Sequence, residues 1–309
     1  MEGYLGNDYL YAAAVFPPAR IMAQDDAVRD WSRNPFKPCE DGMEFKEIVF
    51  QVAEGIATLT LNRADIRNAI THPDMIAEIM AVCAEVNARL DIQALIVTAV
   101  DPAFSSGGNV KDMKERKGMF AGTPAELVEQ YRRNLQEVLL AVYNVEIPTI
   151  AAINGSAVGA GCGLALMCDI RVASVKATFG ETFLNVGLIP GDGSAFTLPR
   201  VIGMAKASEL IFTAETIDAA SALELGLINH VVEHEELLTR ATAIARKIAG
   251  RPPQATRLTK KLLRLGVHST LAESMIQAAA FQSLCHFTED HMEALNAMFE
   301  KRKPNFQGR

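Results

Sequence analysis

Cysteine is scarce in this 309-residue sequence, and its five copies form no pairing pattern. None of them belongs to a Cys-x-x-Cys pair, and the odd number leaves one without a partner. This usage excludes a disulfide-stapled framework and is typical of reduced, buried thiols in a cytoplasmic protein. The histidines are scattered, and the spacing of His286 and His291 does not place them on one helix face. We therefore predict that the chain holds no metal ion.

Positive charge and long apolar runs are also in short supply. The formal net charge is -7, and a single short basic cluster, residues 301–303, lies near the C-terminus. This balance argues against nucleic-acid binding. No stretch is long and apolar enough to span a membrane, and the apolar residues 9–16 follow acidic residues rather than the basic ones of an export signal. We therefore expect a cytoplasmic protein that binds neither nucleic acid nor membranes.

The sequence divides into three regions by its patterning. Residues 1–43 contain the only tryptophan, several prolines and no sustained period, so we expect a loosely ordered N-terminal extension. Residues 44–245 alternate β-rich and helical segments and form the expected core. Residues 246–309 are helical, and the amphipathic run 271–299 has little sheet to pack on. We therefore predict that this last region makes contacts between subunits.

A segment rich in small residues, from Ile147 to Gly163, is the most distinctive feature of the chain. Residues 149–153 are β-branched or small and predict a strand, which breaks at 154–155. The small residues 159–163 then lead into a helix. Strand, turn and helix start together expose backbone N–H groups at a positive helix end. Such a turn can bind an anion, or stabilise an oxygen that becomes one.

Three interpretations of this turn are open. A dinucleotide fingerprint requires a glycine at the position of Leu164 and an acidic strand end about twenty residues further on, and both are missing. An oxyanion hole would use the bare N–H groups to polarise a carbonyl. A tight packing corner between strand and helix would bind no ligand.

A second glycine turn occurs earlier in the chain. The buried strand expected at 95–99 runs into Ser105-Ser106-Gly107-Gly108, and a helix expected at 125–142 leads to the segment at 147–163. Strand, glycine turn and helix therefore occur twice. Parallel strands buried between helices would bring both turns to the same sheet edge, which favours an α/β fold and the oxyanion interpretation.

These motifs resemble those of the crotonase family, the enoyl-CoA hydratases and isomerases. The turns at 103–109 and 147–168, the segment 187–203 and the ending 299–306 occur in the order of that family. The resemblance implies a crotonase-like spiral of ββα repeats with a C-terminal helical trimerisation region, assembled as a homotrimer or homohexamer. It also implies an acyl-CoA thioester as substrate, with coenzyme A as part of the substrate and no separate cofactor.

The resemblance also implies roles for individual residues. The thioester oxygen would accept hydrogen bonds from the backbone N–H groups of Ser106 and Ala160, which would stabilise an enolate. Lys301, reaching from another subunit, matches a phosphate contact, and a solvated C-terminal charge is the alternative. The positions that match contacts to the adenine, the pantetheine and the acyl group are Asp65, Ile66, Arg67, Gly107, Gly108, Asn109, Gly159 and Phe183.

The chain departs from the family pattern at two positions that carry the chemistry. Hydratases of the family use two glutamates for proton transfer, and these positions are Gly163 and Phe183 here. Each proton-transfer group is typically worth a factor of about 10²–10⁴ in rate. The chain should therefore bind and polarise an acyl-CoA but hydrate a simple enoyl-CoA poorly. Phe183 in place of a carboxylate suggests an apolar wall in the acyl pocket.

Two other carboxylates are candidates for the missing acid or base. Asp192 lies in a Pro-Gly-Asp-Gly turn among apolar residues, where its pKa would be raised. The alternative is that it caps the following helix. Glu181 lies two residues before Phe183 and would share its side of a regular strand, or it is solvated or salt-bridged.

Three functions are compatible with these residues. The first is an enzyme of the enoyl-CoA hydratase/isomerase type that isomerises or hydrolyses through an enolate, because one carboxylate suffices to move a proton between two carbons. The second is a true hydratase with relocated acid and base. The third is a non-catalytic acyl-CoA-binding subunit.

Overall fold

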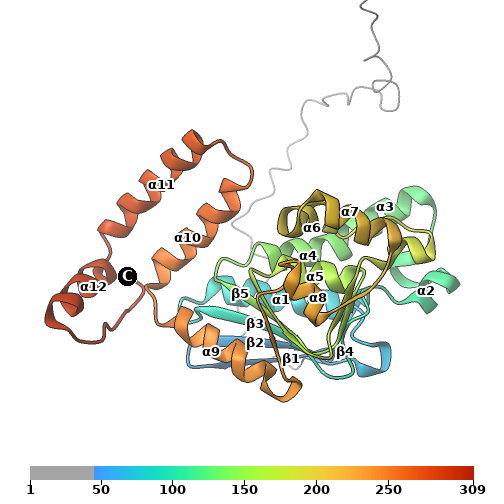
Figure 1. Ribbon diagram of the computed structural model, residues 1–309, viewed down its shortest axis with the longest axis horizontal. Helices are drawn as coiled ribbons and strands as arrows, with labels where there is room; N and C mark the ends of the chain where they lie inside the picture. The colour runs from blue at the N-terminus through green and yellow to red at the C-terminus, as the bar shows by residue number, and fades with distance from the viewer. Residues whose placement is uncertain (1–44) are drawn as a thin grey trace, which may run out of the picture. The chain divides into compact units, whose positions relative to one another are not determined.

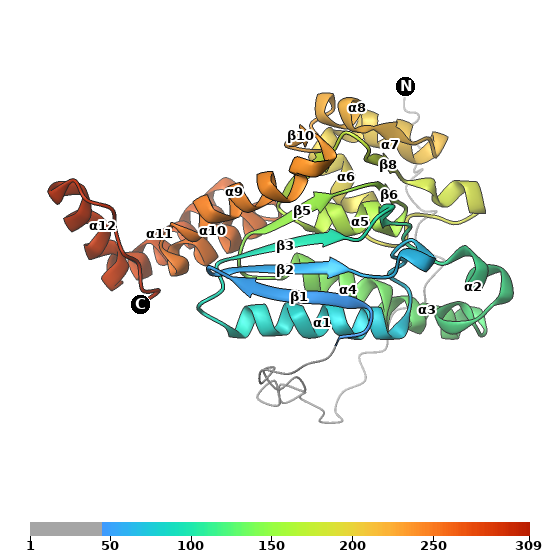
Figure 2. The same ribbon diagram turned by 90° about the horizontal axis from the view of Figure 1, so that it is seen from below.

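The computed structural model describes residues 45–309, so the predicted extension at 1–43 lies outside the described residues. Figures 1 and 2 show the main sheet with helices on both of its faces, and this sheet has six strands. Its strands run in the order β1-β2-β3-β5-β7-β10. The first pair is antiparallel and the other neighbouring pairs are parallel, as expected when helical connections cover a sheet.

This sheet begins with a hairpin. β1 (Ile48–Ala53) pairs with β2 (Ile56–Leu61), and the two residues between them, Glu54 and Gly55, both have positive φ, as a tight hairpin turn requires. The strands that follow are β3 (Ala94–Ala99), β5 (Thr149–Ile153), β7 (Ile170–Ser174) and β10 (His230–Val232). β3 and β5 are buried along their whole length, which explains their continuous runs of apolar and small residues.

A second sheet of four strands is built from segments that follow strands of the first. It contains β4 (Ala103–Ser105), β6 (Ser156–Val158), β8 (Thr178–Gly180) and β9 (Ile217–Asp218), in that order. β4, β6 and β8 come directly after β3, β5 and β7, so a pair of strands recurs along the chain with helices after it. This recurrence confirms the predicted α/β fold of repeated ββα units.

Helices cover the six-stranded sheet on both faces. One face carries the larger apolar core, to which α1, α4 and α5 contribute side chains. These helices are α1 (Pro73–Ala88), α4 (Leu135–Tyr143) and α5 (Ala160–Met167). The opposite face is covered by α9 (Leu237–Ala249), whose Leu237, Ala241 and Ala245 pack against the strands. Figure 2 shows α9 and α1 on opposite sides of the sheet.

Shorter elements complete the described residues. The helices are α2 (Val110–Glu115), α3 (Pro124–Arg133), α6 (Ser194–Ile202), α7 (Met204–Thr213) and α8 (Ala219–Glu224). The 3₁₀ turns are η1 (Ala64–Ile66), η2 (Gly118–Phe120), η3 (Thr182–Val186) and η4 (His234–Glu236). Asp218 caps α8 by accepting a hydrogen bond from the N–H of Ser221.

Two elements differ from the sequence-based expectation. The helix expected at 125–142 is broken into α3 and α4 at Asn134, whose φ of -118° and ψ of -90° are not helical and whose amide donates to the carbonyl of Gln130. The extended segment expected at 178–183 ends at Gly180, and a 3₁₀ turn begins at Thr182. The second difference matters for Glu181, which does not lie in a strand.

The C-terminal region consists of three helices. They are α10 (Pro253–Gly266), α11 (Leu271–His286) and α12 (Glu289–Glu300), with α10 and α11 side by side in Figure 1. The predicted single run 271–299 is two helices because Thr288 caps α12. α10 is anchored to the core by Lys260 and Arg264, whose side-chain nitrogens each lie 2.7 Å from a carboxylate oxygen of Asp169.

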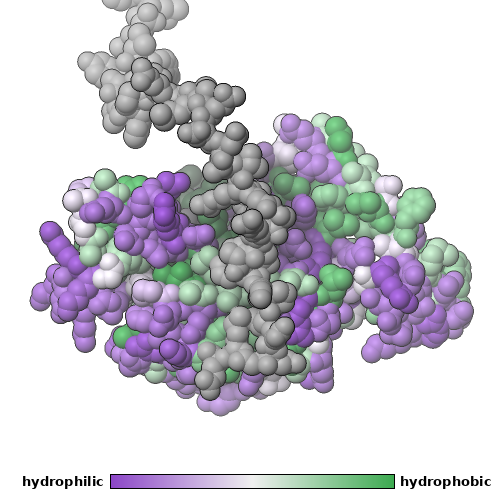
Figure 3. Space-filling model, turned by 180° about the vertical axis from the view of Figure 1, so that it is seen from behind, coloured by the Kyte–Doolittle hydropathy of each residue, from purple (hydrophilic) through white to green (hydrophobic). Residues whose placement is uncertain are grey.

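The surface of these C-terminal helices is rich in exposed apolar side chains. No residue of α11 is buried, and apolar surface gathers over this part of the chain in Figure 3. The largest exposed apolar residues there are Leu263, Leu271, Met275, Ile276, Leu284, Phe287, Met298 and Phe299. Within the part of the chain that the structure describes, no helix combines the length and the apolar character needed to cross a bilayer.

Candidate active site

The N-terminus of α5 offers unpaired backbone donors. Gly159 precedes the helix with a φ of +51°, which a residue with a side chain rarely adopts, and its N–H donates to the carbonyl of Gly180 at 2.8 Å. Among the described residues, no hydrogen bond uses the N–H of Ala160 or of Gly161. The first turn of α5 therefore presents two free N–H groups at the positive end of a buried helix.

The two predicted glycine turns meet at this helix end. A Cβ atom added to Gly107 would lie 2.7 Å from the backbone nitrogen of Ala160 and 2.9 Å from that of Gly161. A Cβ atom added to Gly161 would collide with the carbonyl oxygen of Ser105. Both glycines are needed because backbone from two distant segments approaches closely here. The predicted convergence of the turns at one sheet edge is therefore confirmed.

Ser106 does not offer the predicted donor. Its backbone N–H donates to the carbonyl of Arg67 at 3.0 Å, and its hydroxyl donates to the carbonyl of Ile66 at 3.3 Å. These bonds contradict the expectation that the Ser106 amide faces a substrate oxygen. Gly108, two residues further on, has an N–H that no hydrogen bond uses within residues 45–309.

The residues expected to contact coenzyme A fall into two groups. The first group is a turn formed by Asp65, Ile66 and Arg67, which is hydrogen-bonded directly to Ser106. The structure therefore brings this turn next to the glycine turn at 105–108. Arg63 donates to both oxygens of Asp65 and holds the pKa of that carboxyl below its usual value. Asn109 donates its N–H to Thr71 and accepts a bond from Lys111 to cap α2.

Lys301 stands apart from these turns. It ends α12 in a left-handed conformation and is exposed. No contact described for residues 45–309 joins it to either glycine turn. Its expected phosphate contact, which involves another subunit, stays a prediction.

Asp192 occupies the space next to Gly163. A Cβ atom added to Gly163 would collide with Oδ2 of Asp192, so this carboxylate fills the space that a side chain at 163 would enter. Asp192 is 2% exposed, and burial raises its pKa. Its Oδ1 accepts bonds from the N–H of Ser194 at 3.0 Å and from the Ser194 hydroxyl at 2.6 Å. In the described part of the chain, its Oδ2 has no hydrogen-bond partner.

Asp192 therefore combines structural features of both alternatives that the sequence left open. One oxygen accepts a bond from the first residue of α6, which is the capping alternative in part, although the N-cap position itself is Gly193. The other oxygen is unpaired among the described residues and faces Gly163. A buried carboxylate oxygen without a partner is costly, and such atoms are typical of functional sites.

Glu181 is buried beside Asp192 rather than solvated. It is 1% exposed, and its Oε2 lies 2.8 Å from the Ser194 hydroxyl oxygen, within hydrogen-bond distance. Burial and the neighbouring Asp192 carboxylate raise the pKa of Glu181 to about 8. The solvated and salt-bridged alternatives are therefore wrong, and so is the argument from strand alternation, because β8 ends before Glu181.

Phe183 lies beside the glycine turn at 159–163, where α5 begins. Its ring is 3.7 Å from the point where a Cβ of Gly159 would lie, and it packs against the main core. This placement agrees with an apolar wall at the turn. Ser194, which joins the two carboxyl groups, was missed by the sequence analysis, although an Asp-x-Ser spacing at a helix start is a known turn signal.

A mostly apolar cavity of about 350 Å³ lies beside Asp192. It is lined by residues of α4, the end of α5, the start of α6 and the segment after α10. Gln136 is its main uncharged polar group, and its amide donates to the carbonyl of Gly191 at 2.9 Å. A larger cavity of about 640 Å³ lies between residues 143–146 and the C-terminal helices.

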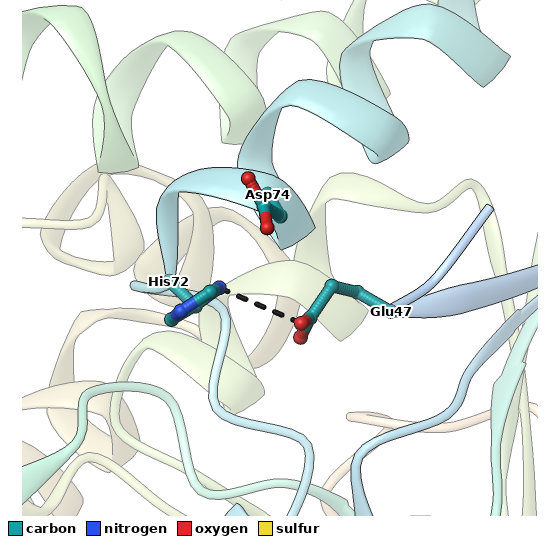
Figure 4. A group of neighbouring side chains, drawn as sticks. All are labelled: Glu47, His72 and Asp74. Atoms are coloured by element: carbon teal, nitrogen blue, oxygen red, sulfur yellow. Dashed lines mark ion pairs between the residues drawn. The ribbon is translucent and has the colours of Figure 1, made fainter.

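Two other groups of polar side chains lie outside this site. Glu47, His72 and Asp74 come together at the start of α1 (Figure 4), with His72 Nδ1 3.6 Å from Glu47 Oε1. The Arg63 guanidinium contacts both oxygens of Glu47 at 2.6 and 2.7 Å, and its positive charge opposes a cation there.

A serine–histidine–aspartate series also occurs near β10. Ser174 Oγ lies 3.1 Å from His234 Nδ1, and His234 Nε2 lies 3.1 Å from Asp101 Oδ2. Ser174 is completely buried and, unlike Asp192, lines neither of the two cavities described above, so a substrate bound in them does not reach its hydroxyl. This series therefore does not support nucleophilic hydrolysis.

The chain is similar to known proteins over most of its length. The family profile described as enoyl-CoA hydratase/isomerase matches residues 51–309. A crotonyl-CoA hydratase of Syntrophomonas wolfei is 35% identical over 85% of this chain and 99% of its own length. A short-chain-enoyl-CoA hydratase of Clostridium acetobutylicum is 35% identical over 84% of this chain and 97% of its own. The crystal structure of an enoyl-CoA hydratase from Bacillus anthracis superposes with a TM-score of 0.80 at 30% identity, covering 85% of this chain and all of that one.

Proposed function

Because the chain belongs to the enoyl-CoA hydratase/isomerase family, we propose that it moves a proton within an acyl-CoA thioester by way of an enolate. Asp192 is the proposed acid–base group. The thioester is the substrate class on which the family acts, and we expect no cofactor apart from its own coenzyme A.

The meeting of Asp192 with Gly163 carries this proposal. In the family pattern a glutamate stands at position 163, whereas here a carboxylate from a different segment enters the same space. Its unpaired Oδ2 and its raised pKa are the properties that a proton acceptor needs, because a base works best when its pKa approaches the working pH.

The proposed oxyanion donors are the N–H groups of Ala160 and Gly108. Ala160 offers an unpaired donor at a helix N-terminus, and Gly108 replaces Ser106, whose amide is bonded to Arg67. Each donor of this kind typically contributes a factor of about 10²–10³ to the rate when negative charge develops on the bound oxygen.

Isomerisation is the reaction that a single carboxylate supports best. Asp192 would take a proton from the α-carbon of a 3-enoyl thioester, and the electron pair left behind would pass to the thioester oxygen. Asp192, whose proton exchanges with solvent between the two steps, would then donate a proton to the γ-carbon as the electron pair comes back. This moves the double bond and restores the carboxylate. No water is consumed, so a second carboxylate to hold the water is not required.

The acyl group is proposed to extend into the apolar cavity beside Asp192. Phe183 at the first turn and the mostly apolar lining favour a hydrocarbon or cyclic acyl chain over a charged one. The volume of about 350 Å³ is sufficient for an acyl chain of moderate size.

Hydration is the second candidate function. The relatives quoted above are named crotonyl-CoA hydratase and short-chain-enoyl-CoA hydratase, and Glu181 provides a second carboxyl group close to Asp192. Two observations argue against hydration. The Glu181 carboxyl group is hydrogen-bonded to the Ser194 hydroxyl, and Phe183 stands at the second glutamate position of the family pattern.

The test uses the full-length protein with a panel of enoyl-, dienoyl- and 3-oxoacyl-CoA thioesters in deuterated water, followed by mass spectrometry. We expect deuterium at the α-carbon and a shifted double bond with at least one 3-enoyl thioester. Rapid hydration of crotonyl-CoA would establish the hydratase instead. Binding of the thioesters without exchange or turnover across the panel would leave a non-catalytic acyl-CoA binder.

A further inference from the structure

Ser194 joins two buried carboxyl groups through a single hydroxyl. Its Oγ lies 2.8 Å from Glu181 Oε2 and 2.6 Å from Asp192 Oδ1, both within hydrogen-bond distance. A serine hydroxyl carries one proton and can donate it to only one of these oxygens. The other contact is a hydrogen bond only if that carboxyl group itself carries a proton. The geometry therefore requires one proton on the Glu181–Asp192 pair.

The surroundings decide which carboxyl group carries this proton. Oδ1 of Asp192 already accepts a hydrogen bond from the N–H of Ser194. A hydrogen bond from the Ser194 hydroxyl would give this oxygen a second donor. Two donors, one of them a backbone N–H, stabilise the Asp192 carboxylate. Glu181 has only the Cys162 thiol, a weak donor, besides Ser194, and no backbone donor among the described residues. The arrangement is thus Glu181–OH donating to Ser194 Oγ, and Ser194 O–H donating to an ionised Asp192.

We propose that protonated Glu181 is a positioning residue that acts through the Ser194 hydroxyl to keep Asp192 ionised and aimed at Gly163. This inference rests on the proposed function of Asp192 as the acid–base group. It goes beyond that function because Glu181 does not contact the substrate and instead keeps Asp192 ionised.

The proposal makes the base sensitive to the ionisation of Glu181. The titratable neighbours are Asp192 from the loop before α6 and the Cys162 thiol on α5, and His268 lines the cavity at Asp192. Burial raises the pKa of the Cys162 thiol well above its usual value, so it stays neutral. When Glu181 loses its proton, two anionic acceptors compete for the one hydroxyl proton of Ser194. The hydrogen bond that stabilises the Asp192 carboxylate is then weakened.

An infrared titration of the free, full-length protein tests the proton assignment without substrate. We expect the C=O band of a protonated carboxylic acid at neutral pH, which disappears as the pH rises through about 8. Glu181→Gln should abolish the band. Asp192→Asn should keep it but move its midpoint to lower pH, because removal of the neighbouring negative charge eases ionisation of Glu181. Absence of the band, or its loss in Asp192→Asn but not in Glu181→Gln, would overturn the assignment.

A kinetic comparison tests the positioning role. Glu181→Leu removes the donor to Ser194 and should lower kcat by about 10-fold or more with little change in KM, the cost of about one hydrogen bond to a charged group. Glu181→Gln carries an amide donor and should restore most of that loss. The wild-type fall in kcat/KM above about pH 8 should be absent in Glu181→Gln.

The outcomes separate this inference from the proposed function. Equal activity of the Leu and Gln variants, or an unchanged alkaline fall in Glu181→Gln, would refute the positioning role. If Asp192→Asn keeps full activity, the proposed function fails instead, and the infrared titration still decides where the proton resides.

Discussion

At the scale of single residues, the proposed chemistry depends on a glycine that leaves room for a carboxylate. Position 163 carries no side chain, and Asp192 from the segment before α6 fills the space beside it. Ser194 and Glu181 then hold this carboxylate from behind. The chemistry of the site therefore depends on contacts between residues that lie 2 to 29 positions apart in the chain.

Gly163→Ala tests whether the space is truly occupied. Alanine normally stabilises a helix interior by about 1 kcal/mol over glycine, but here its methyl group collides with Asp192 Oδ2, so we expect a loss of about 1–3 kcal/mol in the free energy of unfolding. Denaturant unfolding measures it. In an Asp192→Ala background the same change should be neutral or stabilising, and equal costs in both backgrounds would show that the two positions do not interact.

Glu181 gives the stability of the fold a pH dependence of defined sign. Its folded pKa of about 8 exceeds its ordinary value of 4.5, so the folded state binds more protons between these values. Stability from this group is therefore complete below pH 4.5 and is lost as the pH rises through about 8.

Glu181→Gln should remove this dependence. Chemical unfolding of both proteins across this pH range measures it, and the wild type should lose stability relative to the variant as the pH rises. A constant difference between the two proteins at all pH values would contradict a buried, protonated Glu181.

At the scale of elements, the sequence predicted the recurring strand, glycine turn and helix, because buried strands and glycine clusters have local signatures. It did not predict which amide is free. The partner of the Ser106 N–H is the carbonyl of Arg67, 39 residues earlier in the chain, and no local pattern shows such a contact. Glu181 was misplaced for a similar reason, since the end of β8 at Gly180 depends on its pairing with β6 and β9.

The close approach of β4 to α5 leads to a testable prediction at the scale of elements. Gly161→Ala places a Cβ against the carbonyl oxygen of Ser105, and backbone cannot move aside as a side chain can. We expect a loss of about 1–3 kcal/mol in unfolding free energy. Gly250→Ala is the control, because its Cβ would meet nothing closer than 3.5 Å and its φ is ordinary. Equal stability of the two variants would show that β4 and α5 are not tightly packed.

At the scale of the whole molecule, the C-terminal helices expose the apolar side chains that the amphipathic run predicted. Phe287 is 91% exposed and Leu271 is 78% exposed, and α11 buries none of its residues against the described chain. Such a surface favours contacts with other subunits, and we propose that this region forms the expected homotrimer or homohexamer.

Phe287→Asp tests this proposal. A charge in the middle of an apolar interface is costly to bury, so the variant should dissociate toward monomers in sedimentation velocity. Leu90→Asp changes a residue that is 67% exposed near the end of α1 and serves as the control with unaltered assembly. A wild-type protein that sediments as a monomer would contradict the proposed assembly.

The rate of α-proton exchange in Asp192→Asn tests the central claim most directly. The substrate would be the best thioester found in the deuterium screen, with wild type and variant compared at saturating concentrations. We expect that the variant still binds the thioester, because the oxyanion donors remain. The α-proton of the thioester should exchange about 10²–10⁴ times more slowly, because the base is lost. Exchange at the wild-type rate would contradict it and would show that another group removes the proton.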